Sequence, residues 1–205
     1  MRVYKRTYKN ILRELYALAR KESRCVKAQV GARIVSPLQL KTISDGFNIT
    51  MPDSCKSVGC HRVAVYGENS CEHRLPSDCY ALHAEICAIS MAAMKSNKST
   101  INKTMVVTRY PCEACARAIV AAGIMRVVYG GVEEISEQTR QIFSKNGVEV
   151  QFIHDDEIYR MDDSEEDEYV DVTEDEEDMN SSVGVDVESR ETDNINEVDD
   201  RSGDT

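Results

Sequence analysis

His83-Ala84-Glu85 and Pro111-Cys112-Glu113-Ala114-Cys115 are the two stretches that decide the fold, because each opens an apolar segment of good helix-forming residues. The composition predicts one helix over residues 82–95 and a second over residues 112–122. Two cysteines at positions i and i+3 of a helix start lie on one face. We therefore expect the two thiols of the second stretch to point the same way, with the histidine of the first stretch able to join them.

His83, Cys112 and Cys115 form a ligand set for zinc, and three protein ligands leave a fourth position open, as in catalytic zinc sites. Zinc in such a site makes hydroxide available at neutral pH. Glu85 follows His83 closely, so its carboxylate can move the proton of that water to a substrate. H-x-E followed by P-C-x-x-C is typical of zinc deaminases. A redox pair or half of a zinc finger is the alternative for the cysteines alone, but no second pair follows at finger spacing.

The rest of the first 154 residues alternates between helical and strand patterns. Helical spacing predicts a first packing helix, and Pro37 separates two strands, of which the second ends in the turn signal Asp45-Gly46. The predicted order is helix 7–22, strands 29–35 and 40–46, helix 82–95, strand 103–109, helix 112–122, strand 125–129, helix 133–146 and strand 148–153. This order predicts an α/β fold with a mixed sheet and helices on both faces.

Residues 47–80 show little periodicity and form a cysteine-rich insert within the predicted domain. A loop of this length is uncommon in a compact domain unless it is functional or held by a metal or a similar link. The insert contains six side chains that can bind a metal ion: Cys55, Cys60, His61, Cys71, His73 and Cys79. Isolated buried thiols are the alternative.

The charge of the chain divides it into a deaminase domain at residues 1–154 and a tail at residues 155–205. The tail has 23 acidic and 3 basic residues, whereas the remainder has 13 acidic and 22 basic ones. The tail is expected to be disordered, because a segment with so many acidic and so few apolar residues cannot bury enough apolar surface to fold. Its acids could simply keep the protein soluble, or could mimic a polyanion; its partner stays open. The basic domain suits a small anionic substrate, and nucleic acid is the less favoured partner.

No apolar run approaches the length of a membrane span, and the N-terminus lacks a signal-peptide core. We therefore expect a cytoplasmic protein without a membrane partner. The eight cysteines then favour metal ligands and reduced thiols over disulfides.

The motifs resemble the cytidine/deoxycytidylate deaminase superfamily, and within it the deoxycytidylate (dCMP) deaminases of phage and bacterial type. The resemblance covers residues 10–153. Its carriers are Ser23-Arg24-Cys25 before Val30-Gly31-Ala32, Gly46-Phe47-Asn48 with Pro52, Gly59-Cys60-His61-Arg62, His83 to Ile89, and Val107 to Ala116.

The resemblance implies a three-layer fold with a five-stranded sheet, a homo-oligomer such as a hexamer, and conversion of dCMP to dUMP for thymidylate synthesis. It also implies activation by dCTP with Mg²⁺ and inhibition by dTTP. Asn48 matches an asparagine that contacts the deoxyribose, and Ala84 is a further expected substrate contact. Arg24 and Lys27 are candidates for holding the phosphate, with exposed surface charges as the alternative.

Some members carry a second, structural zinc, and the positions of its ligands match Cys25, Cys55, His73 and Cys79. Cys60, His61 and Cys71 compete with them. Two positions depart from the family pattern: Ile49 replaces a glycine after Asn48, and Cys87 replaces an asparagine that supports the site. Cys87 is expected to be a small buried residue. Tyr110 could pack on the pyrimidine ring or fill the core.

Two other functions stay open at the level of sequence. A deaminase of this type could act on dCTP, cytidine, tRNA or single-stranded DNA instead of dCMP. A non-catalytic, regulatory deaminase fold is the third possibility, although the ligand set and Glu85 are all present.

Overall fold

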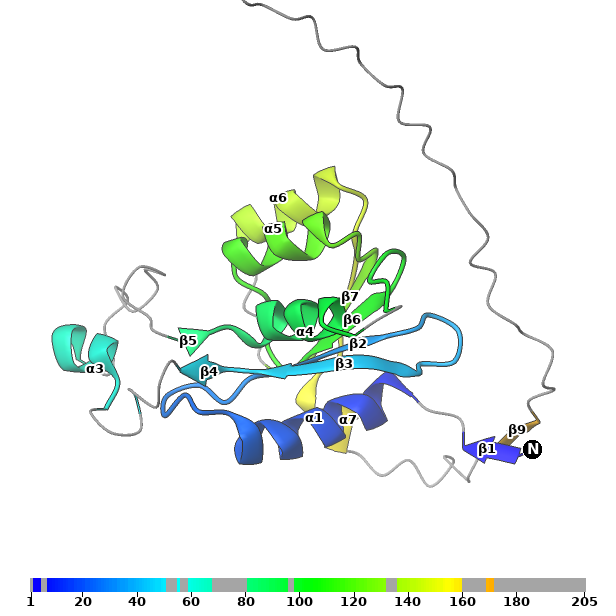
Figure 1. Ribbon diagram of the computed structural model, residues 1–205, viewed down its shortest axis with the longest axis horizontal. Helices are drawn as coiled ribbons and strands as arrows, with labels where there is room; N and C mark the ends of the chain where they lie inside the picture. Colours follow the sequence, from blue (N-terminus) through cyan, green and yellow to red (C-terminus); the bar gives the residue numbers. More distant parts are fainter. Residues whose placement is uncertain are drawn as a thin grey trace, which may run out of the picture.

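A mixed five-stranded sheet forms the centre of the protein (Figure 1). The computed structural model describes residues 2–4, 7–50, 55, 59–67, 81–95, 98–131, 136–159 and 169–171. The strand order is β3-β2-β6-β7-β8, where β2 is Gly31–Val35, β3 Thr42–Phe47, β6 Thr104–Val107, β7 Arg126–Tyr129 and β8 Glu149–Phe152. β2 pairs antiparallel with β3 and β6, whereas β6, β7 and β8 run parallel. The mixed five-stranded sheet expected from the sequence is confirmed.

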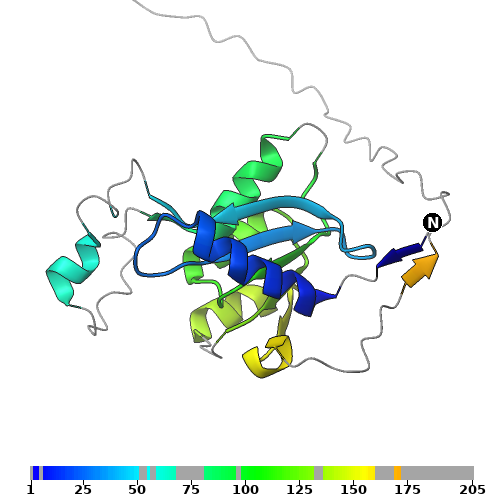
Figure 2. The same ribbon diagram turned by 90° about the horizontal axis from the view of Figure 1, so that it is seen from below.

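Helices cover both faces of this sheet, as Figures 1 and 2 show. The helices are α1 (Tyr8–Glu22), α4 (Ala84–Ala93), α5 (Glu113–Ala121), α6 (Glu137–Lys145) and α7 (Asp155–Tyr159). One core cluster joins α4, α5 and α6 to the sheet through residues such as Ala88, Ile119 and Phe143. The other joins α1 and α7 through Leu12 and Ile158. The three-layer arrangement places the two candidate helices, α4 and α5, in the same layer.

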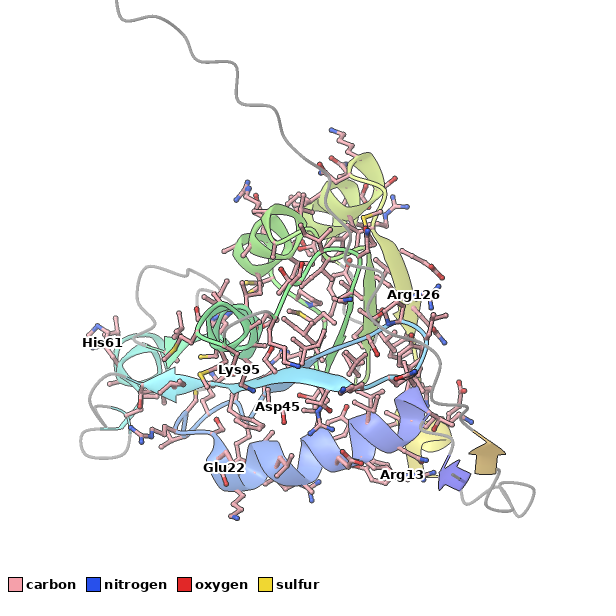
Figure 3. The ribbon with its side chains drawn as sticks, turned by 45° about the vertical axis from the view of Figure 1, so that its right-hand side comes forward. Arg13, Glu22, Asp45, His61, Lys95 and Arg126 are labelled. Atoms are coloured by element: carbon pink, nitrogen blue, oxygen red, sulfur yellow. The ribbon has the colours of Figure 1, made fainter. Side chains whose placement is uncertain are left out.

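An ion-pair cluster fixes α1 against the β2–β3 hairpin. The Arg33 side chain on β2 is 6% exposed and donates to both carboxylate oxygens of Asp45, at 2.6 and 3.0 Å, and to Glu14 of α1. Asp45 lies on the side of the sheet that faces α1 (Figure 3). Burial opposes the charge, but these bonds raise the pKa of Arg33. The cluster therefore stabilises the packing of the first helix on the sheet.

The prediction of a turn at Asp45-Gly46 is wrong, because both residues lie inside β3. The reversal between β2 and β3 falls at residues 36–41, where Leu40 has a φ of 49°. Gly46 serves a different need: a β-carbon there would come within 2.2 Å of the Ala88 nitrogen and 2.3 Å of the Ala84 carbonyl oxygen. Only glycine lets α4 lie this close to β3.

The cysteine-rich insert is less irregular than the sequence predicts. β4 (Ile49–Thr50) and β5 (Ala81–Leu82) pair antiparallel, and α3 (His61–Tyr66) forms between them. The pairing brings both ends of the insert together directly before α4. Cys71, His73 and Cys79 lie outside the described residues.

The packed body continues beyond residue 154, where the acidic tail was expected to begin. Ile158 of α7 is fully buried against α1, and Arg13 Nε donates to its carbonyl oxygen. The Tyr16 hydroxyl lies 3.1 Å from an Asp155 carboxylate oxygen. Farther along, β9 (Tyr169–Asp171) pairs antiparallel with β1 (Arg2–Tyr4). Residues 160–168 and 172–205 lie outside the described part, so the expected disorder there stays a prediction. Among the described residues, no helix is long and apolar enough to cross a membrane.

Candidate metal centre and active site

Two helix N-termini bring the predicted zinc ligands together. His83 is the N-cap of α4, Cys112 is the N-cap of α5, and Cys115 lies in the first turn of α5. The His83 Nδ1 atom lies 3.5 Å from Cys112 Sγ and 3.4 Å from Cys115 Sγ. All three ligand atoms lie within 4.8 Å of one another, and no other group of this kind occurs among the residues that the structure describes.

These separations fit a tetrahedral zinc ion. With Zn–N near 2.0 Å and Zn–S near 2.3 Å, tetrahedral geometry places nitrogen and sulfur about 3.6 Å apart. The observed nitrogen–sulfur distances of 3.4 and 3.5 Å agree with that value. A soft set of two thiols and one imidazole also suits zinc better than magnesium or calcium. The residues present therefore fit a zinc ion with one coordination position left for water or substrate.

The electrostatics of the site favour a thiolate at Cys112. The hydrogen bond from the Cys115 thiol, supported by His83, lowers the pKa of Cys112 to about 4. The same hydrogen bond, together with burial, raises the pKa of Cys115. The positive end of the α5 dipole adds to the stability of a thiolate at the start of this helix.

Glu85 lies in the first turn of α4 and borders the ligand group. The residue is 4% exposed, and the Cys115 sulfur lies within hydrogen-bonding reach of its carboxylate. Burial raises the pKa of Glu85 above its ordinary value. A buried carboxylate with a raised pKa, placed beside the metal ligands without belonging to them, can both accept and return a proton.

Strand β3 and the insert strands set the position of α4. The Ser44 hydroxyl donates to the Ala88 carbonyl oxygen at 2.8 Å. β5 leads directly into His83, and it is held by β4 in the register Ile49 with Leu82 and Thr50 with Ala81. Continuing this register by one residue places Asn48 opposite His83, at the N-terminus of α4.

The predicted substrate contacts differ in their surroundings. Asn48 is 6% exposed, and its Oδ1 atom has no hydrogen-bond partner. Its backbone is fixed by bonds to Val30, Ser23 and Arg24. Ala84 is fully buried in the first turn of α4. The Arg24 and Lys27 side chains are exposed, in the segment that leads from α1 to β2.

Cys87 is buried, and Tyr110 packs against the core while remaining partly exposed, so its contact with the pyrimidine ring stays a prediction. Cys87 is 2% exposed, which confirms it as a buried residue, and burial raises its pKa while the Ile49 and Phe47 backbones hydrogen-bond to the thiol. The Tyr110 ring packs edge-on against Tyr129, with ring centroids 4.8 Å apart. Tyr110 therefore packs against the core near the loop that carries Cys112.

The second zinc site stays a prediction. Cys25 and Cys55 are both buried, and the Cys25 sulfur accepts a hydrogen bond from the Ala28 amide at 3.4 Å. Cys60 is the N-cap of α3, directly before His61. His73 and Cys79, the remaining members of the expected set, lie outside the described residues.

Two polar residues near the site had no role in the sequence interpretation. The Thr108 hydroxyl accepts from the Gly31 amide at 3.0 Å and holds the end of β6, just before the loop to Cys112. Thr50 is fully buried, and its hydroxyl has no partner. The two-residue spacing between Asn48 and Thr50 was the one signal in the sequence that could have suggested a shared face.

The chain is similar to several curated proteins, most of which are named deoxycytidylate deaminase. The curated relatives include ComE operon protein 2 of Bacillus subtilis (28% identical; 66% of this chain and 66% of that protein). They also include the human deoxycytidylate deaminase, which is 33% identical over 55% of this chain and 58% of that protein. The deoxycytidylate deaminase of a Mycobacterium phage is 32% identical over 54% of this chain and 84% of that protein. The chain thus covers about two thirds of the Bacillus relative and 58% of the human one.

A crystal structure and a family model agree with this likeness. The dCMP deaminase of the cyanophage S-TIM5, in apo form, superposes with a TM-score of 0.51 at 24% identity, over 71% of this chain and 96% of that one. This supports the fold. The family model described as the cytidine and deoxycytidylate deaminase zinc-binding region matches residues 5–131, which is more than half of the chain and includes His83, Glu85, Cys112 and Cys115. The chain therefore belongs to the cytidine and deoxycytidylate deaminase family.

Proposed function

We propose that this protein is a zinc-dependent hydrolase that converts dCMP and water to dUMP and ammonia. One observation carries the proposal: His83 Nδ1 and the sulfurs of Cys112 and Cys115 converge at two helix N-termini, beside the buried carboxylate of Glu85. The relatives named deoxycytidylate deaminase favour dCMP as the substrate.

The residues of the chain have distinct roles in this reaction. His83, Cys112 and Cys115 would hold a zinc ion, which supplies a nucleophilic water at neutral pH. Glu85 takes a proton from the attacking water and delivers it to the ring nitrogen of the pyrimidine. It then takes the second proton of the same water, from the hydroxyl now on the ring carbon, and passes it to the amino group, which leaves as ammonia while the ring carbon keeps the oxygen as a carbonyl. The low exposure of Glu85 keeps this proton inside the site.

The rest of the nucleotide would be held by the surroundings of α4. The unpartnered Asn48 Oδ1 is an acceptor suited to a sugar hydroxyl, and Ala84 borders the ring at the start of α4. Arg24 and Lys27 supply positive charge for the phosphate, in the segment that also donates a backbone bond to the Asn48 carbonyl.

The proposal extends to the setting of the enzyme. We infer a cytoplasmic homo-oligomer, a hexamer by its resemblance, that supplies dUMP for thymidylate synthesis and responds to dCTP with Mg²⁺ and to dTTP. Cys25, Cys55, Cys60 and Cys87 form no disulfide, which fits a reducing compartment. The deaminase domain would extend to Tyr159, followed by an acidic tail.

A substrate panel tests the function. Purified, zinc-loaded protein is assayed for ammonia release from dCMP, dCTP, cytidine, single-stranded DNA and tRNA, with and without dCTP or dTTP as effector. We expect the highest kcat/KM with dCMP. Turnover of a polymer without turnover of dCMP would overturn the proposal, and so would zinc-loaded protein that deaminates none of the substrates.

A further inference from the structure

The residues of β3 alternate between the two faces of the sheet. Ser44 and Gly46 face α4, since Ser44 donates to the Ala88 carbonyl and Gly46 lies against the same helix turn. Asp45 and Phe47 face α1: Asp45 pairs with Arg33 beside Glu14, and Phe47 packs with the α1 core cluster. From Ser44 onward, past the register shift between Ile34 and Val35, the even-numbered residues of this strand are therefore on the α4 face.

The same alternation continues into β4. The backbone stays extended, because the Asn48 amide donates to the Val30 carbonyl in the register that pairs Gly31 with Phe47. Burial alternates as well: Asn48 and Thr50 are 6% and 0% exposed, whereas Phe47 and Ile49 are partly exposed. Asn48 and Thr50 therefore lie on the same side of the extended backbone as Ser44 and Gly46. Along this side, Asn48 is nearer to the N-terminus of α4 and Thr50 lies beyond it. In Figure 1, β4 continues the line of β3, with α4 above β3 and β5 above β4.

Two side-chain oxygens on this face lack a partner. The Asn48 Oδ1 and Thr50 Oγ1 atoms are buried and make no hydrogen bond. A buried polar atom without a partner is unfavourable, and such atoms in native proteins usually meet a partner that is bound in the functional state. Two of them on one strand face, leading away from His83 and Glu85, indicate a built polar surface for a ligand.

We propose that Thr50 binds the phosphate of the nucleotide, donating its hydroxyl proton to a phosphoryl oxygen. The inference rests on the proposed function and adds a specificity-determining residue to it. Along the face, the order is Glu85 at the α4 N-terminus, then Asn48, then Thr50 about 7 Å farther along the strand. This is the order of base, sugar and phosphate in a nucleotide. Asn48 Oδ1 can only accept, which suits a sugar hydroxyl, whereas the threonine hydroxyl can donate to an anion.

Thr50→Val tests the assignment, because valine keeps the shape and removes only the hydroxyl. A hydrogen bond to a charged oxygen contributes enough that its loss should raise the KM for dCMP about 10- to 100-fold, with little change in kcat. Thr50→Ser should stay near wild type. Deoxycytidine lacks the phosphate, so its kcat/KM should be equal in Thr50→Val and in the wild type.

The chain offers a matched control in Thr139 on α6. Its hydroxyl is also fully buried and unpartnered, but it lies outside the α4 face. Thr139→Val should leave both substrates unaffected. A Thr50→Val variant with the wild-type KM for dCMP would overturn the inference, and an equal loss with dCMP and deoxycytidine would overturn the phosphate assignment by placing the contact on the sugar.

Binding of dUMP separates this inference from the proposed function. By isothermal titration calorimetry, wild-type protein should bind dUMP about 10- to 100-fold more tightly than Thr50→Val. A wild type that binds dUMP with this difference but releases no ammonia from dCMP would contradict the function and support the Thr50 contact. Equal dUMP affinity in the two proteins, or no binding by the wild type, would overturn the Thr50 contact.

Discussion

Gly46 on β3 lies directly against Ala88 on α4, so closely that a β-carbon at position 46 would come within 2.2 Å of the Ala88 nitrogen. The clashing atoms belong to the helix backbone and cannot rotate away. This contact fixes the distance between the sheet and the helix that presents His83 and Glu85.

We predict that Gly46→Ala lowers the free energy of unfolding by about 3 kcal/mol or more and reduces bound zinc, because α4 must move. Urea unfolding and metal content measure the two effects. Gly147→Ala is the control, because Gly147 has a φ of 67° and no atom near its β-carbon position. This variant should lose only about 1–2 kcal/mol of its free energy of unfolding and should keep its zinc. Equal effects in both variants would contradict the role of Gly46.

Glu85→Gln should keep zinc and lose turnover. The amide has the shape of the carboxylate but cannot accept the proton of the attacking water, so kcat should fall by about 100-fold to 10,000-fold. Ammonia release measures kcat, and elemental analysis confirms that zinc is retained. Near-normal activity in this variant would show that another group transfers the proton.

We predict two zinc ions per chain in protein purified without chelators. Cys115→Ser should remove the ion at the active site together with turnover, since zinc requires its thiolates. Cys55→Ser should remove only the second ion. Elemental analysis of the wild type and both variants decides, and a wild-type content of one zinc would exclude the second site.

Asp45→Asn should destabilise the fold without a direct effect on chemistry. The Arg33 guanidinium, 6% exposed, loses one of two charged partners, which we expect to lower the free energy of unfolding by about 1–3 kcal/mol. Glu149→Gln breaks the more exposed ion pair with Arg126. It should change the free energy of unfolding by about 0.5 kcal/mol. Urea unfolding curves that give similar values for the two variants would rule out a special contribution of the buried pair.

A shortened chain tests where the packed body ends. Removing the residues after 160 should leave the stability within about 1 kcal/mol of the full chain. Removing those after 154 deletes Ile158 and the Asp155 bond to Tyr16, and should lower the free energy of unfolding by about 2–5 kcal/mol. Urea unfolding measures the stability of the two shortened chains. The Ile158→Ala variant tests the same contact in the full-length chain. Equal stability of the two shortened chains would contradict the contribution of α7.

The metal ligands could be predicted from the sequence because their chemistry fixes their spacing. His83 and Glu85 must share one helix start, and Cys112 and Cys115 must share one helix face. The alternation of helices and apolar strands likewise predicted the mixed sheet, since buried parallel strands need continuous apolar runs.

The missed features depend on contacts between distant parts of the chain. Asp45-Gly46 has the composition of a turn, and only the approach of α4 explains a glycine within a strand. The acids at the start of α7 suggested a tail, although Ile158 packs against a helix more than 140 residues earlier. The unpartnered hydroxyl of Thr50 becomes visible only when its burial is known.

The α1–α7 contact has a practical consequence for attaching this protein to a support. α1, at the beginning of the packed body, and α7, at its end, both lie on the sheet face opposite α4 and α5 (Figures 1 and 2). A linker attached at Tyr8 or Tyr159 therefore starts on the sheet face opposite α4 and α5. Protein immobilised through such a linker should keep those helix starts turned toward the solution.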